Sequence, residues 1–81
     1  MPTPPTHQTH LDTSGLYCPE PIMLLHGHMD QLDAGQILLL TATDPASVRD
    51  VNKFCHFLGH ALVHQQTAEA PFQFWIQKKP T

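Results

Sequence analysis

Residues 18–32 read CPEPIMLLHGHMDQL, and this stretch decides the fold. Its two prolines argue against a strand, because a proline has no N–H to donate within a sheet. Proline is tolerated in the first turn of a helix, where the N–H groups lack an intrahelical acceptor. The apolar residues that follow recur at helical spacing and share one face: Ile22, Leu25, Met29 and Leu32. The stretch therefore predicts a helix with Cys18 as its N-cap and Pro19 as its first residue, ended by residues 33–35.

The segments after this helix predict a strand and a second helix. Residues 36–43 are β-prone, with apolar side chains toward both faces, which is typical of a central strand. Asp44-Pro45 then supplies a helix cap followed by a proline at the first helical position. Gly59 marks the end of this second helix, where a left-handed residue often stands. Its core face consists of Val48, Val51, Phe54, Cys55 and Leu58.

Three further strands are expected at residues 9–14, 61–67 and 72–77, which gives the order βαβαββ. In the last strand apolar and polar residues alternate, which predicts one core face and one mostly open face. This order fits an α+β two-layer sandwich, with two helices on one face of a four-stranded mixed sheet. We expect the other sheet face to be apolar enough to bind a partner, with contributions from Leu38, Leu40 and Trp75.

Length and composition limit the chain to one small domain. It has 81 residues and a net charge of −3, so no basic surface is available for direct nucleic-acid binding. Its longest apolar runs fall far short of the about 20 residues that a membrane helix needs. Residues 1–10 lack the features of a signal peptide, which predicts a cytoplasmic protein. We expect a flexible N-terminal arm at residues 1–8 and a single domain at residues 9–79.

Cys18 is the strongest candidate for chemistry. A sulfur at a helix N-terminus meets unpaired N–H groups and the positive end of the helix dipole, which favour the thiolate. The charge of the neighbouring Glu20 acts in the opposite direction, so a moderately reactive thiol is expected. The supporting motif is Pro19, Glu20 and Pro21, whose prolines present the thiol at a rigid corner. No CxxC partner is present, so monothiol chemistry is expected, such as carrying a sulfur atom. His26 and His28 point about 160° apart on the helix, so neither is placed to act as a base.

The other cysteine and the histidines are interpreted as structural or solvent-exposed. Cys55 belongs to the apolar face of the second helix and is expected to be a core residue. His56 and His60 have i, i+4 spacing, but Gly59 is expected to end the helix between them. His60 and His64 are expected to share a strand face, with no third ligand near them in the sequence. We therefore predict no metal site, although a histidine-based metal protein remains the least favoured alternative.

A small docking rim is expected beside the thiol. Several residues fall at the edges of the two predicted core faces, near Cys18, where they could contact a protein partner. Ordinary incomplete burial in a tiny domain is the other interpretation of the same pattern. The residues are Met23, Leu24, Arg49, Lys53 and Phe57.

Residues 11–21, LDTSGLYCPEP, resemble the TusA (SirA-like) family of small sulfur-carrier proteins, whose hallmark is a Cys-Pro-x-Pro box at the first helix. Later blocks are also similar in order and spacing: Asp44-Pro45-Ala46-Ser47, Arg49-Asp50, the segment at residues 54–63 and the strand that opens with Pro71-Phe72. The resemblance spans residues 11–79. It implies the same βαβαββ two-layer fold.

The resemblance also implies a role for Cys18. It would accept sulfur as a persulfide from a donor such as a cysteine desulfurase and pass it to a downstream acceptor protein, for example toward 2-thiouridine in tRNA. Molybdenum-cofactor synthesis and sulfur oxidation remain open as destinations. Such a sulfurtransferase-like carrier acts stoichiometrically, without a cofactor and without turnover of a free small molecule. The alternative from another class is a non-catalytic interaction module that uses the open sheet face.

Overall fold

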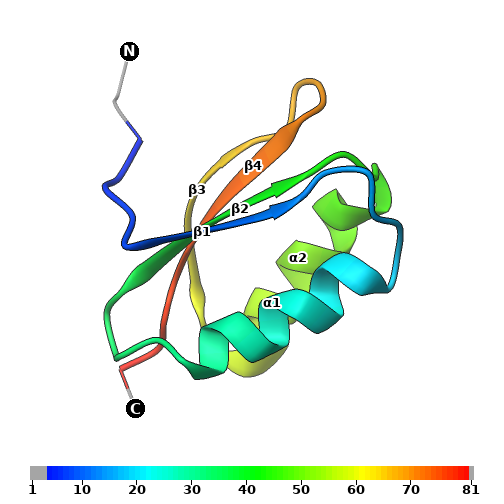
Figure 1. The fold of residues 1–81 in the computed structure, drawn as a ribbon. Helices are drawn as coiled ribbons and strands as arrows, with labels where there is room; N and C mark the ends of the chain where they lie inside the picture. Colours follow the sequence, from blue (N-terminus) through cyan, green and yellow to red (C-terminus); the bar gives the residue numbers. More distant parts are fainter. Residues whose placement is uncertain (1–3, 81) are drawn as a thin grey trace.

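The structure is a computed structural model, and it describes residues 4–80. The elements follow the predicted order βαβαββ, and both helices lie on the same face of the sheet (Figure 1). The α+β two-layer sandwich is therefore confirmed. The elements are β1 (Thr9–Thr13), α1 (Glu20–Asp30), β2 (Ile37–Ala42), α2 (Ala46–Leu58), β3 (Ala61–Gln66) and β4 (Phe72–Gln77). Among the described residues, no helix is long and apolar enough to cross a membrane.

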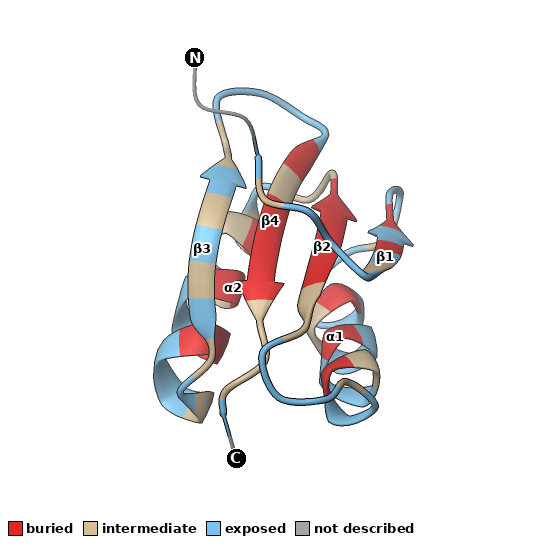
Figure 2. Ribbon diagram, turned by 90° about the vertical axis from the view of Figure 1, so that its left-hand side faces the viewer, coloured by how far each residue is buried: buried red, intermediate tan, exposed pale blue. Residues whose placement is uncertain are grey.

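The four strands form one mixed sheet in the order β1-β2-β4-β3. β1 runs parallel to β2, as expected for two strands that a helix connects, and the other two pairs are antiparallel. β2 and β4 occupy the centre of the sheet and are its most buried strands (Figure 2). The loop that carries the candidate site follows the carboxyl end of β1 and is hydrogen-bonded to the residues after β2.

The core lies between the sheet and the two helices. Apolar residues from both layers are almost wholly buried there: Leu25, Met29, Leu38, Leu40, Val51, Phe74 and Ile76. Ile22 and Leu32 pack against this cluster and are only partly buried. The helical face that the sequence predicted for residues 22–32 is thus the face that α1 and its C-terminal turn present to the sheet.

The predicted membership of the outer sheet face was wrong for two residues. Leu38 pairs with Ile76 and Leu40 with Phe74, so both point toward the helices and into the core. Side chains alternate between faces with a period of two, so a set of residues chosen one position out of phase lies on the wrong face. The outer face instead carries Leu39 beside the correctly placed Trp75.

This outer face is also less open than the sequence suggests. Leu39 is 7% and Trp75 5% exposed. The His64 ring lies 4.9 Å from the Trp75 ring, and the N-terminal segment passes over this side of the sheet (Figures 1 and 2). Gln8 fixes that segment: its N–H donates to the Ile37 carbonyl at 2.9 Å, and its side-chain oxygen accepts the Ile37 N–H at 2.7 Å.

The expectation that His60 and His64 share a strand face was wrong. The pairing of β3 with β4 shifts by one residue between Leu62 and His64, which is a β-bulge. His64 therefore pairs with Trp75 on the outer face. The His60 ring instead lies 5.8 Å from the Phe54 ring, on the helix side. One inserted residue reverses the face of every side chain beyond it.

Candidate functional site

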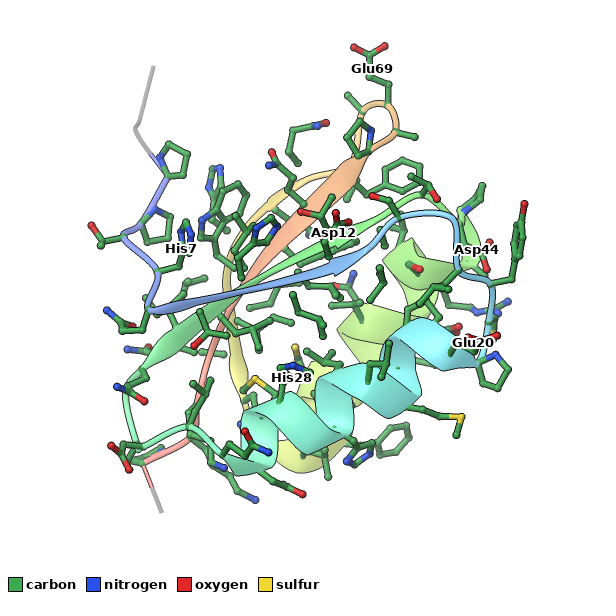
Figure 3. The ribbon with its side chains drawn as sticks, in the orientation of Figure 1. His7, Asp12, Glu20, His28, Asp44 and Glu69 are labelled. Carbon is green, nitrogen blue, oxygen red and sulfur yellow. The ribbon has the colours of Figure 1, made fainter. Side chains whose placement is uncertain are left out.

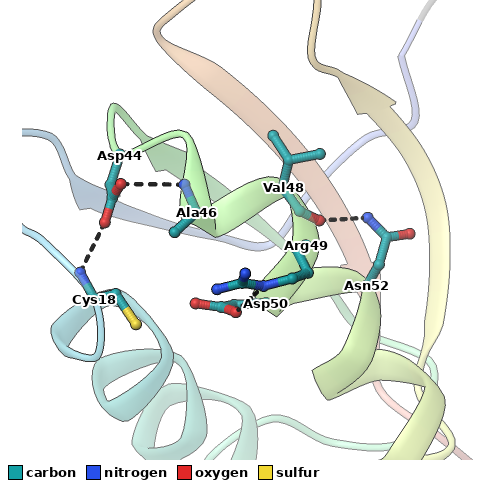
Figure 4. Close-up of polar contacts among 7 residues, drawn as sticks. All are labelled: Cys18, Asp44, Ala46, Val48, Arg49, Asp50 and Asn52. Carbon is teal, nitrogen blue, oxygen red and sulfur yellow. Dashed lines mark hydrogen bonds and ion pairs between the residues drawn. The ribbon is translucent and has the colours of Figure 1, made fainter.

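The loop between β1 and α1 carries Cys18, and two hydrogen bonds tie this loop to the residues after β2. Gly15 turns the chain with a positive φ of 83°, and its N–H donates to the Thr43 hydroxyl at 2.8 Å. The Cys18 N–H donates to Asp44 Oδ2 at 2.8 Å, while Asp44 Oδ1 accepts the Ala46 N–H at 3.1 Å (Figure 4). Asp44 thus joins the thiol loop to the first turn of α2.

Cys18 is exposed, but it is not the N-cap that the sequence predicted. Pro19 is the N-cap, because its carbonyl accepts the Met23 N–H at 3.1 Å and its φ and ψ of −98° and 11° are not helical. Asp44 holds the Cys18 N–H outside the helix, which explains the shift of one residue. This contact joins residues 26 positions apart in the chain, so the local sequence around the helix start could not have predicted it.

The motif residues after the thiol have separate structural roles. Pro19 lines the space beside Cys18, and Pro21 is buried against the core at the second helical position. Glu20 is exposed in the first turn, where a carboxylate is favoured by the helix dipole. Glu20 and Asp44 lie at the same end of the molecule, whereas His7 lies on the other side of the sheet (Figure 3).

An open apolar pocket of about 330 Å³ lies beside the thiol, between α1 and α2. Its walls come from both helices, so neither helix alone defines it. Its lining residues are Cys18, Pro19, Ile22, His26, Asp50, Lys53, Phe54, Phe57 and Leu58. Most of these side chains are apolar, so the sulfur stands at the edge of a surface suited to an apolar group.

The charges around the sulfur act against the thiolate. The nearby Asp50 carboxylate is the main reason why the pKa of Cys18 is raised, and a loss of hydration and the charge of Asp44 raise it further. The Arg49 guanidinium opposes this effect but is the smallest contribution. The expectation that the helix N-terminus favours the thiolate is therefore wrong for this site. The two carboxylates that disfavour the thiolate come from α2 and from the loop before it.

Asp50 is itself held by its neighbour in the sequence. Arg49 Nε lies 3.2 Å from Asp50 Oδ1, and the Arg49 side chain is mostly exposed (Figure 4). His26 also lines the pocket, with its ring edge-on to Phe54 at 4.8 Å. The sequence interpretation missed Asp50, which the packing of α1 against α2 brings to the pocket of Cys18. That His26 is not placed to act as a base toward Cys18 stays a prediction.

The predicted docking residues divide into two groups. Lys53 and Phe57 line the pocket, and Phe57 is 79% exposed. Met23 and Leu24 are exposed on α1 but do not line the pocket, and Arg49 contacts Asp50. The prediction thus named two residues of the pocket wall and two apolar residues on the helix beside it.

Helical spacing shows that the pocket residues of α2 share one side of that helix. Asp50, Lys53, Phe54 and Phe57 are separated by three, one and three positions, which places them on one side of α2. Asp50 was noted only as part of the family resemblance. Its approach to Cys18 depends on how the two helices pack, which local spacing does not encode.

The second cysteine is a core residue, as predicted. Cys55 is buried in α2, and loss of hydration raises its pKa to about 11, so it stays a neutral thiol.

The histidines do not form a helical pair. Gly59, with a φ of 77°, is the C-cap of α2, so His56 lies within the helix and His60 lies beyond its end. Within residues 4–80, no three His, Cys, Asp or Glu side chains gather as a metal site.

Known proteins match almost the whole domain. Residues 9–78 match the family described as Sulfurtransferase TusA. A protein of Pseudomonas entomophila (strain L48) named sulfur carrier protein TusA is 51% identical over 73 residues, which cover 90% of this chain and 91% of the relative. A protein of the same name from Pseudomonas putida (strain F1) is 54% identical over 69 residues, 85% of this chain and 86% of the relative.

Proposed function

The chain belongs to the TusA family, and from this premise we propose that it is a sulfur carrier that holds its sulfur as a persulfide on Cys18. The observation that carries the proposal is the exposed Cys18 thiol at the edge of the apolar pocket. A carrier must present its sulfur to two different proteins in turn. An exposed thiol beside an open apolar surface meets that requirement, whereas the buried Cys55 does not.

The loading step moves one sulfur atom without net oxidation or reduction. The Cys18 sulfur attacks the outer sulfur of a persulfide on the donor protein, and a new S–S bond forms. The S–S bond of the donor breaks, and its electron pair leaves with the donor sulfur as a thiolate. The proton lost by Cys18 balances the proton that the released thiolate takes up. The same exchange in reverse order transfers the sulfur to the next protein.

The donor that we propose is a cysteine desulfurase, and the acceptor is a downstream protein such as one that leads to 2-thiouridine in tRNA. We propose that this relay operates in the cytoplasm. Docking would use the apolar and charged residues around the thiol, since aromatic residues, Met and Arg are enriched in protein interfaces. These residues are Met23, Leu24, Arg49, Lys53 and Phe57.

Intact-mass measurement tests the assignment. The wild-type chain and the Cys18→Ser and Cys55→Ser variants are incubated with a cysteine desulfurase and cysteine, then weighed before and after treatment with a reductant. We expect one reducible sulfur atom on the wild type and on Cys55→Ser, and none on Cys18→Ser. Thiosulfate serves as a second donor. Equal loading of Cys18→Ser, or no loading from either donor, would remove Cys18 as the carrier.

A further inference from the structure

We propose that Asp50 handles the proton of the Cys18 thiol: its carboxylate lines the same pocket as the sulfur and accepts the thiol proton when the sulfur attacks a donor persulfide. This inference rests on the proposed carrier function and adds a residue to it. Asp50 is thereby assigned to the reacting sulfur itself, rather than to the docking surface.

The structure places the two groups in the lining of the same pocket. Cys18 comes from the loop before α1 and Asp50 from the second turn of α2, and both line the same pocket. Figure 4 shows the Cys18 and Asp50 side chains on the side where the thiol loop and α2 meet. Asp44 fixes the Cys18 backbone at 2.8 Å, and Arg49 fixes Asp50 Oδ1 at 3.2 Å. The cysteine and the carboxylate are therefore each held in place by a second residue.

The charges around the sulfur are mainly negative, as expected where a carboxylate holds the thiol proton. Asp50 and Asp44 disfavour the thiolate, and Arg49 is the one cation that favours it among the groups that shift this thiol. His26 and Lys53 also line the pocket, from α1 and α2 respectively. Because the thiolate is the reactive form, the carboxylates keep an exposed cysteine less open to oxidation and alkylation while no partner is bound.

The same carboxylate has a use during sulfur transfer. As the Cys18 sulfur bonds to the outer sulfur of the donor persulfide, its proton moves to Asp50. The donor S–S bond breaks, and the released donor thiolate then takes the proton from Asp50. Atoms and charge balance without another reactant. Alkylation by iodoacetamide differs, because the iodide that leaves needs no proton.

This difference provides a sharp test with Asp50→Asn, which keeps the shape of the side chain and removes its charge. Alkylation of Cys18 by iodoacetamide is followed from pH 6 to 10 by peptide mass spectrometry, so that Cys55 is counted separately. We expect the midpoint of the pH profile to fall. A unit charge at contact distance in water changes the thiolate fraction about fivefold, and the lower nucleophilicity of a more acidic thiol reduces the rate gain at pH 7.5 to about two- to threefold.

Sulfur loading from a desulfurase persulfide should change in the opposite direction. We expect Asp50→Asn to load at least about tenfold more slowly, because the proton has lost its acceptor. Arg49→Gln should raise the midpoint, since it removes the cation that favours the thiolate. Glu69→Gln is the matched control for charge, because Glu69 lies at the tip of the β3–β4 hairpin (Figure 3), and it should leave both readouts unchanged.

An unchanged or raised midpoint in Asp50→Asn would overturn the proposal, and so would loading that accelerates together with alkylation. If the wild-type chain takes no sulfur from any donor, the carrier function fails. The midpoint of the alkylation profile still decides in that case whether Asp50 holds the thiol proton.

Discussion

Phe57 should contribute more to partner binding than to folding. Its side chain is 79% exposed at the wall of the pocket beside Cys18, although phenylalanine is normally buried. Truncation by Phe57→Ala removes the ring and leaves the helical backbone of α2 in place. We expect weaker binding to the sulfur donor and a free energy of unfolding changed by no more than about 0.5 kcal/mol, as for other exposed sites.

The size of the binding loss follows from the exposed area. A phenylalanine buries about 150–250 Å² when it is fully covered, and a 79% exposed ring can therefore lose about 120–200 Å² to a partner. At about 25 cal/mol per Å² this area corresponds to an upper limit of about 3–5 kcal/mol. Ordering the side chain and its partner groups reduces the net effect to about 2 kcal/mol, which is a rise in Kd of about 30-fold.

The assay is isothermal titration of the wild type and Phe57→Ala against a cysteine desulfurase, with thermal unfolding measured in parallel. Val63→Ala is the matched control, because Val63 is 42% exposed on β3 and does not line the pocket. We expect this control to bind within about twofold of the wild type. The reasoning is refuted if Phe57→Ala binds as tightly as the wild type, or if the two variants lose the same affinity.

Three further predictions concern stability. Gly27→Ala should stabilise α1 by about 1 kcal/mol and raise Tm by about 4–8 °C, because an added Cβ meets nothing within 4 Å; Gly59→Ala, at a φ of +77°, should instead lower Tm. Leu40→Ala should cost about 2–5 kcal/mol in urea unfolding, because Leu40 is fully buried, and a cost under about 1 kcal/mol would contradict the assigned core. The fold should also lose stability in acid through His60, whose pKa lies below its ordinary 6.5 because of burial and the charges of Lys78 and Lys79. Its neutral form is favoured on folding, so its contribution is present above pH 6.5 and is lost as the pH falls through the folded pKa. The slope of Tm between pH 7.5 and 5 should therefore be smaller in His60→Gln, and an equal slope in both proteins would exclude His60 as the cause.

The elements of the fold were predictable because their signals are local. Prolines at residues 19 and 21 exclude a strand, helical spacing marks the buried faces of both helices, and Gly59 ends α2 with a positive φ. The order βαβαββ and the two-layer arrangement follow from these signals. The faces of the sheet were harder to assign, since Leu38 and Leu40 differ from Leu39 only by their phase along β2.

The composition of the candidate site was only partly predictable. Cys18 stands out in the sequence through the prolines beside it, and Phe57 stands out as an apolar residue at the edge of a helical face. The acidity of the thiol was predicted with the wrong sign. Local rules consider the helix that follows the cysteine, whereas the groups that set its pKa come from Asp44 and Asp50.

The sequence by itself determined the secondary structure, the family resemblance and the cysteine that we propose as the sulfur carrier, because capping, periodicity and motif spacing act over a few residues. Only the tertiary structure decided what surrounds that cysteine. Packing α1 against α2 forms the pocket, and Asp44 reaches Cys18 across 26 positions of the chain. The electrostatic effect of a charged group on the sulfur depends on their distance in space and not on their separation in the sequence. The protonation of the thiol therefore depends on residues that meet only after folding.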